Sequence, residues 1–178
     1  NIEKVKLLNP DLIIANKEEN TKEDVEALRK LAPVWLSDIA NLEDSISMIN
    51  SIGDLTGKIN EARSIIDKIK SGFEELSSLK RVRKSVIYFI WNEPGYAAGR
   101  GTFINDMLSK CGFENAIQEE RYPEVNKNIK PVFVFLSSEP FPFKEKHIKL
   151  YQELYPNAII KIVDGEMFSW YGSKLIES

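Results

Sequence analysis

The stretch Pro131-Val132-Phe133-Val134-Phe135-Leu136 decides the fold class, because it is too short for a helix and is almost wholly apolar. A strand that is buried on both faces of a parallel sheet shows this kind of run. A loop over residues 137–143 follows, then a helix, then a second apolar run over residues 158–163. The apolar side chains of the expected helix are Ile148, Tyr151 and Leu154. The segment therefore predicts a β-loop-α-β unit with parallel strands.

The same plan occurs near the start of the chain. Residues 10–15 (PDLIIA) predict a strand, and residues 34–36 (VWL) predict its partner. Between them we expect a polar loop over residues 16–20 and a helix that begins at about Thr21 and ends before Pro33. The repetition predicts two α/β lobes.

A strongly helical stretch separates the two repeats. Asn41 is a suitable N-cap, with Asp44 at the third helical position. Gly57 ends this helix, and a second one is expected to run to about Leu79. At 1.5 Å per residue, roughly 22 residues make a rod of about 33 Å.

We therefore predict three parts: residues 1–41 as the remainder of an N-terminal lobe, residues 42–80 as linker helices that include a long backbone helix, and residues 81–178 as a C-terminal α/β lobe. Two strands and one helix would leave a sheet face of the first lobe uncovered. The expectation is that this lobe is incomplete, either because an N-terminal piece is missing or because its strands complete a sheet supplied elsewhere.

Composition excludes several classes of protein. The net charge of −3 argues against a nucleic-acid groove, which needs clustered Lys and Arg. The single cysteine and the single histidine argue against a zinc site. Cys111 falls within an apolar periodic stretch and is expected to be a small buried residue.

Aromatic side chains concentrate in the loops that follow the predicted strands of the second lobe. In parallel sheets, ligands bind beyond the carboxyl ends of the strands. Aromatic loops there suit a large planar ligand. An alternative interpretation also stays open, in which some of these rings simply fill the end of the sheet. The residues concerned are Trp91, Tyr96, Phe141, Phe143, Phe168, Trp170 and Tyr171.

Other residues give weak signals of a site. The sequence Gly99-Arg100-Gly101-Thr102 opens a helix, whose free N–H groups would suit an anionic ligand edge. It lacks the spacing of a nucleotide-binding loop. Glu93 and Glu139 each precede a proline and are interpreted as loop punctuation, and His147 is expected to be a solvated helical residue. The case for an enzyme is therefore thin.

Several motifs resemble one family of transport proteins. The opening NIEKVKLLNPDLIIA, the segment from Ala98 to Asn115, and the loops LSSEPFPF (136–143) and DGEMFSWYG (164–172) carry the resemblance. They are similar to the helical-backbone metal receptor branch of the periplasmic binding proteins, which serve ABC importers of vitamin B12, ferric siderophores and haem. The resemblance spans essentially the whole chain.

The resemblance implies a fold and a role. It implies two α/β lobes joined by a long helix, as in class III periplasmic binding proteins, and a corrinoid or ferric-siderophore chelate clamped between the lobes. The expected ligand contacts are Asn16, Lys17, Trp91, Tyr96, Arg100, Phe141, Trp170 and Tyr171. It further implies one acidic residue on each lobe that docks on the ABC permease, and Glu23 and Glu145 are the candidates. Carboxylates that merely favour a helix N-terminus are an equally good interpretation of both.

Two departures from the family stand out. Family members have about another half-lobe before the position of Asn1. In this chain, few residues separate the stretch Tyr122–Asn126 from the strand at Pro131, where relatives usually fit a helix. The second departure leaves one wall of the second lobe undefined.

The overall prediction is an exported, monomeric, non-enzymatic receptor, periplasmic or anchored at the cell surface, with no cofactor and no metal ligands of its own. The metal arrives inside its chelate. The alternatives are an α/β metal-chelatase-like enzyme and a ligand-free interaction module on the same fold.

Overall fold

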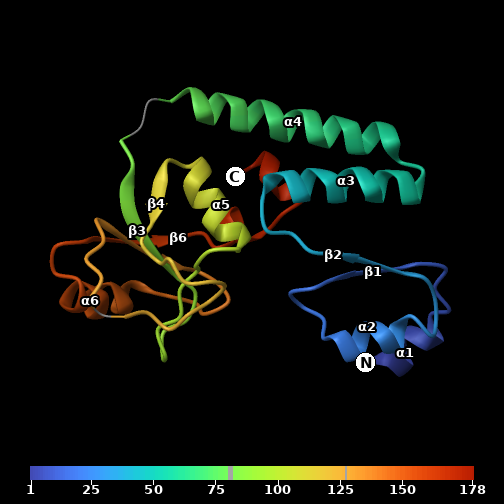
Figure 1. Ribbon diagram of the computed structural model, residues 1–178, viewed down its shortest axis with the longest axis horizontal. Coiled ribbons are helices and arrows are strands. Elements are labelled where there is room, and N and C mark those ends of the chain that lie inside the picture. Colours follow the sequence, from blue (N-terminus) through green and yellow to red (C-terminus); the bar gives the residue numbers. More distant parts are fainter. Residues whose placement is uncertain (80–81, 127) are drawn as a thin grey trace. The chain divides into compact units, whose positions relative to one another are not determined.

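The computed structural model describes residues 1–79, 82–126 and 128–178, which form two compact units, residues 1–39 and 40–178. The first unit contains α1 (Ile2–Leu7), β1 (Ile13–Asn16), α2 (Lys22–Leu28) and β2 (Val34–Ser37). Its two strands pair in parallel, with Ile13 opposite Val34, so the first predicted β-α-β repeat is confirmed (Figure 1). The helix α1 was not predicted.

The second unit begins with two long helices and continues into a sheet. Its elements are α3 (Leu42–Thr56), α4 (Ile59–Ser78), β3 (Lys84–Phe89), α5 (Phe103–Lys110), β4 (Phe113–Asn115), β5 (Phe133–Ser137), α6 (Glu145–Leu154), β6 (Ile159–Val163), α7 (Glu166–Ser169) and the 3₁₀ turn η1 (Ser173–Ile176). The sheet has the order β4-β3-β5-β6, and all its pairings are parallel. The second predicted repeat is β5-α6-β6, and it is also confirmed. The short strand β4 was not predicted.

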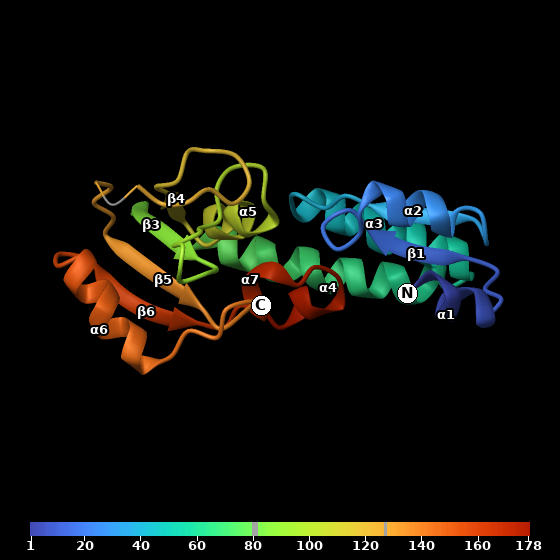
Figure 2. The ribbon, with the colours of Figure 1, turned by 90° about the horizontal axis from the view of Figure 1, so that it is seen from below.

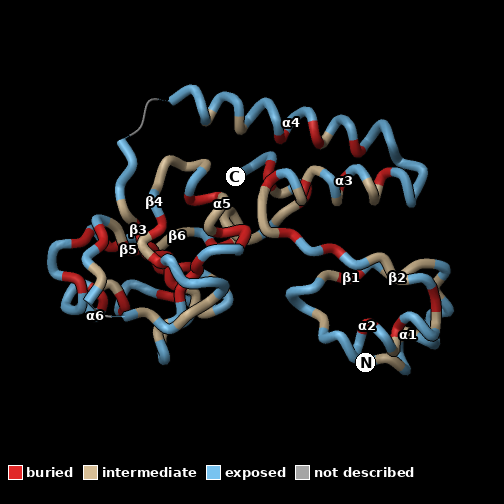
Figure 3. Tube along the Cα trace, in the orientation of Figure 1, coloured by how far each residue is buried: buried red, intermediate tan, exposed pale blue. Residues whose placement is uncertain are grey.

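Both faces of this sheet are buried, as its apolar runs predicted. Ile87 and Phe89 of β3 join a cluster with Tyr151 of α6, whereas Val86 and Tyr88 join a second cluster with Leu108 of α5. The alternation of neighbouring side chains between faces produces the two clusters. Figure 3 shows the buried part of the chain concentrated along these strands.

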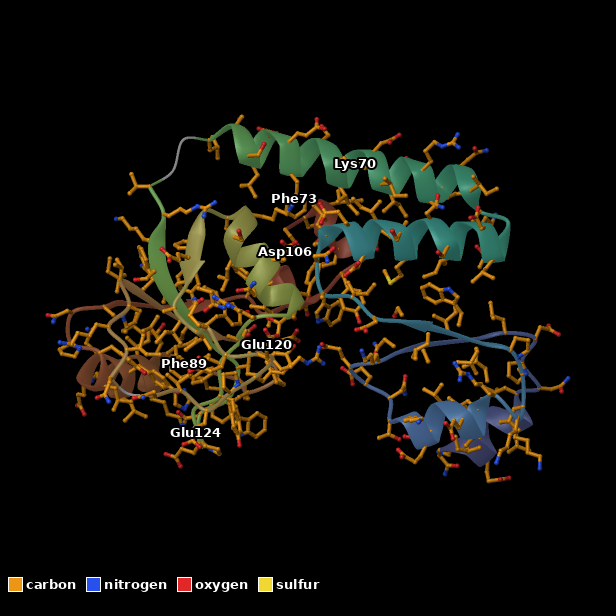
Figure 4. The ribbon with its side chains drawn as sticks, viewed as in Figure 1. Lys70, Phe73, Phe89, Asp106, Glu120 and Glu124 are labelled. Atoms are coloured by element: carbon orange, nitrogen blue, oxygen red, sulfur yellow. The ribbon has the colours of Figure 1, made fainter. Side chains whose placement is uncertain are left out.

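The helices α3 and α4 begin and end where their capping residues indicate. The side chain of Asn41 accepts a hydrogen bond from the Asp44 N–H at 2.9 Å, and Gly57 ends α3 at a φ of 69°. Asp106 of α5 accepts a hydrogen bond from the Leu42 N–H at 2.9 Å, which ties the start of α3 to α5 (Figure 4). The two predicted helices are thus confirmed, and α3 packs along α4.

Residues 122–126, before Pro131, form no helix. They pair with the loop over residues 95–100, since the Ala97 N–H donates to the Pro123 carbonyl at 3.1 Å and the Val125 N–H donates to the Gly95 carbonyl at 2.9 Å. The wall that the sequence left undefined is therefore formed, at residues 123–125, by a segment that is hydrogen-bonded to this loop.

Cys111 is only half buried, which corrects the expectation of a buried residue, because it is the C-cap of α5 and lies just past the buried stripe of that helix. The division at residues 41/42 and 80/81 stays a prediction, and residues 80 and 81 lie outside the described residues.

Candidate functional site

The candidate site is the surface formed by the loops at the carboxyl ends of β3, β5 and β6, which we call the strand-end surface. The loops comprise residues 90–102, 138–144 and 164–172. Because β3, β5 and β6 are parallel neighbours, their following loops emerge at one edge of the sheet. Figure 2 shows α7 just beyond the ends of β5 and β6.

Trp91 and Phe141 meet at this surface. Their ring centroids are 5.6 Å apart in an edge-to-face arrangement, and Phe141 in turn lies 4.8 Å from Phe143. Trp91 is 41% exposed, whereas Phe143 is only 4% exposed. A row of rings thus runs from the core to the surface, so Phe143 plugs the sheet end and Trp91 displays its ring.

Phe168 and Tyr171 are packed onto the body of the unit. The ring of Phe168 lies 5.2 Å from that of Tyr88, and the ring of Tyr171 lies 5.6 Å from that of Phe103. Phe168 therefore anchors α7 to the sheet, in agreement with the alternative interpretation that some of these rings fill the end of the sheet. Tyr171 remains half buried and has one ring edge against α5.

Trp170 is the most exposed of the aromatic residues at this surface, with half of its area accessible. Its indole Nε1–H donates to Glu139 Oε1 at 2.7 Å. Glu139 is the second residue after β5, and the sequence alone suggested only loop punctuation for it. The signal that identifies it is an acidic residue at the carboxyl end of a buried strand, within the motif that resembles the family.

Tyr96 and Arg100 lie in the loop after β3. Tyr96 is exposed, and its carbonyl accepts a hydrogen bond from the Ile90 N–H at 2.9 Å, which folds the loop back on itself. The Arg100 guanidinium donates to the side chain of Gln118. The expectation of free N–H groups here is wrong for Gly99 and Arg100, because these groups already donate to the carbonyls of Arg121 and Glu119.

The predicted residues of the first unit lie at the end of β1. Asn16 Oδ1 accepts a hydrogen bond from the Glu19 N–H at 2.7 Å, and Lys17 forms an ion pair with Asp38. The tight turn that Asn16 closes therefore holds the end of the strand. Both residues stay predicted ligand contacts.

The two acidic candidates for docking occupy similar places in the repeated units. Glu23 lies in the first turn of α2, and Glu145 is the first residue of α6. Both are exposed. Each helix follows the first strand of a parallel β-α-β unit.

His147 is buried, which corrects the expectation of a solvated residue. Its ring packs against Phe141 and Phe143, and its Nδ1 accepts a hydrogen bond from the Lys144 N–H at 2.8 Å. The helical spacing was right, but the loop before α6 folds its aromatic rings over this face. The imidazole has a structural role at the start of the helix.

Burial also governs the polar groups beneath the strand-end surface. The Tyr88 hydroxyl donates to Ser137 Oγ at 3.0 Å, inside the sheet. Burial raises the pKa of Tyr88 above its ordinary value, and the nearby charges of Glu139 and Asp164 raise it further. This phenol is a neutral hydrogen-bond donor at physiological pH.

Within residues 1–79, 82–126 and 128–178, no group of three or more His, Cys, Asp or Glu side chains is arranged to hold a metal ion. Across the same residues, no helix combines the length and the apolar character that crossing a bilayer requires.

Comparison with known families gives the decisive observation. The model of the family described as periplasmic binding protein matches residues 1–134. The chain belongs to this family. The parallel sheets and helices of the structure agree with the predicted class III fold of periplasmic binding proteins, and the family and its matched members are substrate-binding proteins rather than enzymes.

Two curated proteins are similar in sequence to this periplasmic binding protein. An uncharacterized ABC transporter substrate-binding lipoprotein of Bacillus subtilis, YvrC, is 25% identical over 131 residues, which cover 67% of this chain and 41% of the relative. A vitamin B12-binding protein of Salmonella choleraesuis is 21% identical over 127 residues, covering 69% of this chain and 47% of the relative. This chain thus spans about half the length of the curated relatives it matches.

The fold is shared with the periplasmic heme-binding protein BhuT, solved in complex with two hemes. The TM-score is 0.85 at 15% sequence identity, over 99% of this chain and 75% of that one. At this identity the likeness concerns the fold alone.

Proposed function

We propose that this chain is part of the substrate-binding component of an ABC importer, and that its strand-end surface binds a metal chelate of the corrinoid or ferric-siderophore type. The observation that carries the proposal is the display of Trp91 and Trp170 on loops that buried rings and hydrogen bonds fix to the sheet. Exposed indoles held in this way offer a large, rigid, apolar contact area.

The chemistry of the surface suits a ligand that brings its own metal coordination. Planar or bulky chelates bind through area and stacking, and a few polar groups set their orientation. Tyr96, Phe141 and Tyr171 supply further aromatic area, and Arg100 supplies a positive charge at the margin of the same loops. Asn16 and Lys17 are the proposed contacts from the first unit.

The relatives support this ligand class. Their printed names include a vitamin B12-binding protein and a heme-binding protein. A substrate-binding lipoprotein among them supports export, so we propose a periplasmic or surface-anchored location. We further propose that the chain acts as a monomer and that Glu23 and Glu145 dock on the permease.

The ligand class is tested by titrating the protein with cyanocobalamin, ferrichrome and haemin. We expect saturable binding of one of these compounds by calorimetry, together with quenching of tryptophan fluorescence corrected for ligand absorbance. Substituting Trp170 with alanine should weaken binding about tenfold or more, because an aromatic anchor contributes roughly 1.5 kcal/mol or more. Trp35→Phe is the matched control, since Trp35 belongs to β2 and lies outside the strand-end surface.

Absence of binding by any of the three chelates, in protein with an intact circular dichroism spectrum, would contradict the proposed ligand class. Equal effects of Trp170→Ala and Trp35→Phe on affinity would show that the ligand binds elsewhere.

The docking role is tested by charge reversal. Glu23→Arg and Glu145→Arg should each lower the stimulation of ATP hydrolysis by the assembled cognate importer in proteoliposomes, without changing chelate affinity. Glu153→Arg is a control at an exposed glutamate near the other end of α6. A loss as large in Glu153→Arg as in Glu145→Arg would refute a specific docking role.

A further inference from the structure

Two motifs that the fold brings together are joined through one carboxylate. Glu139 belongs to the loop after β5, and Ser169 and Trp170 lie at the end of α7. Glu139 Oε1 accepts a hydrogen bond from Trp170 Nε1 at 2.7 Å and lies 2.9 Å from Ser169 Oγ. A hydrogen bond with a charged partner is shorter and stronger than a neutral one.

The side chain of Glu139 packs closely against Gly165, in the loop after β6. A Cβ on Gly165 would lie 2.5 Å from Glu139 Cγ, so the side chain of Glu139 passes directly over that glycine. The Gly165 N–H donates to Ser138 Oγ at 2.9 Å, and the Ser138 N–H donates to the Val163 carbonyl at 3.0 Å. The loops after β5 and β6 are therefore interlocked beneath the indole.

The indole is held at one edge and open elsewhere. Trp170 is 50% exposed although its only polar side-chain atom is engaged. A side chain as exposed as this would otherwise sample several rotamers, and ordering it on binding would weaken affinity. Anchoring of Nε1 removes that freedom beforehand.

We infer that Glu139 is a positioning residue, which fixes the indole of Trp170 in the orientation that receives the ligand. The inference rests on the proposed function, because it assigns Glu139 to the binding of the same chelate.

The first experiment needs no ligand. In ¹⁵N-labelled protein, the chain's three tryptophans give three indole N–H resonances, and Trp170→Phe identifies the one that belongs to Trp170. In Glu139→Ala, that resonance should shift and its exchange with water should quicken, while the resonances of Trp35 and Trp91 stay in place. Glu139→Gln keeps an acceptor oxygen and should largely preserve the wild-type resonance.

The second experiment is a double-mutant cycle with cyanocobalamin as the probe. Glu139→Ala should weaken binding about tenfold in the wild-type background, whereas Glu139→Gln should stay within about threefold. In the Trp170→Phe background, where the indole donor is gone, Glu139→Ala should have little further effect. A residue with a merely structural role would lower affinity equally in both backgrounds.

The outcomes separate the inference from the proposed function. An unchanged Trp170 resonance in Glu139→Ala, or equal losses of affinity in both backgrounds, would overturn the positioning role. Failure of the wild-type protein to bind cyanocobalamin would overturn the role of Glu139 in binding this probe, while the resonance experiment still decides whether Glu139 holds the indole.

Discussion

The contact between Gly165 and Glu139 gives a sharp test of how the strand-end surface is built. Gly165 precedes α7 with φ −64° and ψ −36°, a conformation that any residue adopts. An alanine there meets no backbone strain. It does place a Cβ 2.5 Å from both Glu139 Cγ and Ser137 Oγ, and 3.2 Å from the Glu139 backbone nitrogen.

The magnitude follows from overpacking. Adding a methyl group to a filled site typically lowers the free energy of unfolding by about 1–3 kcal/mol. Gly72 is the matched control in α4, because a Cβ added there would meet no heavy atom within 4 Å apart from the neighbouring backbone of its own helix. Gly72→Ala should raise the free energy of unfolding by about 1 kcal/mol, through helix propensity.

Urea unfolding followed by circular dichroism measures both substitutions, which lie in the same unit, residues 40–178. A loss of about 2 kcal/mol lowers the midpoint by about 1 M if the slope is about 2 kcal/mol per molar. If Gly165→Ala is as stable as the wild type while Gly72→Ala is stabilised as expected, the close approach of Glu139 to Gly165 is refuted.

Three further substitutions or conditions test other parts of the second unit. Asn115→Ala should lower the free energy of unfolding by about 2–3 kcal/mol, because the Asn115 side chain makes three hydrogen bonds. Its Nδ2 donates to the Ala98 carbonyl and to Asn105 Oδ1, and its Oδ1 accepts a hydrogen bond from the Ile117 N–H. A urea midpoint equal to that of the wild type would contradict this network. Asp106→Ala should lower it by about 0.5–2 kcal/mol through loss of the acceptor for the Leu42 N–H, and Asp106→Asn, which keeps an acceptor, should lose less in the same assay. Burial raises the pKa of Tyr88, Tyr151 and Tyr155 above 10.0 in the folded protein, so stability should be fully present below about pH 10 and fall as the pH rises above it. Absorbance titration checks this last prediction, and normal titration of all six tyrosines in folded protein would refute it.

Local patterns in the chain predicted the two β-α-β units, the two long helices and the fold class, but not the short elements α1 and β4. The apolar runs at residues 131–136 and 10–15, each followed by a helical pattern and another apolar run, indicate parallel β-α-β units. Asn41 and Gly57 set the ends of α3 through local backbone chemistry, which needs no distant partner. The aromatic loops were recognisable because the carboxyl ends of parallel strands share one edge.

Packing across the fold decides which of those loop residues are exposed and available to bind a ligand. That packing buried Phe143 and His147, turned Tyr171 against Phe103, and left Trp91 and Trp170 exposed. It also paired Gly99 and Arg100 with the segment around Arg121, so their N–H groups are occupied. Glu139 and Trp170 are 31 residues apart in the chain, and their hydrogen bond arises because β5 and β6 are neighbours in the sheet. Periodicity reports the face on which a residue lies, whereas its partners across the fold depend on strand order and loop packing, which no local pattern contains.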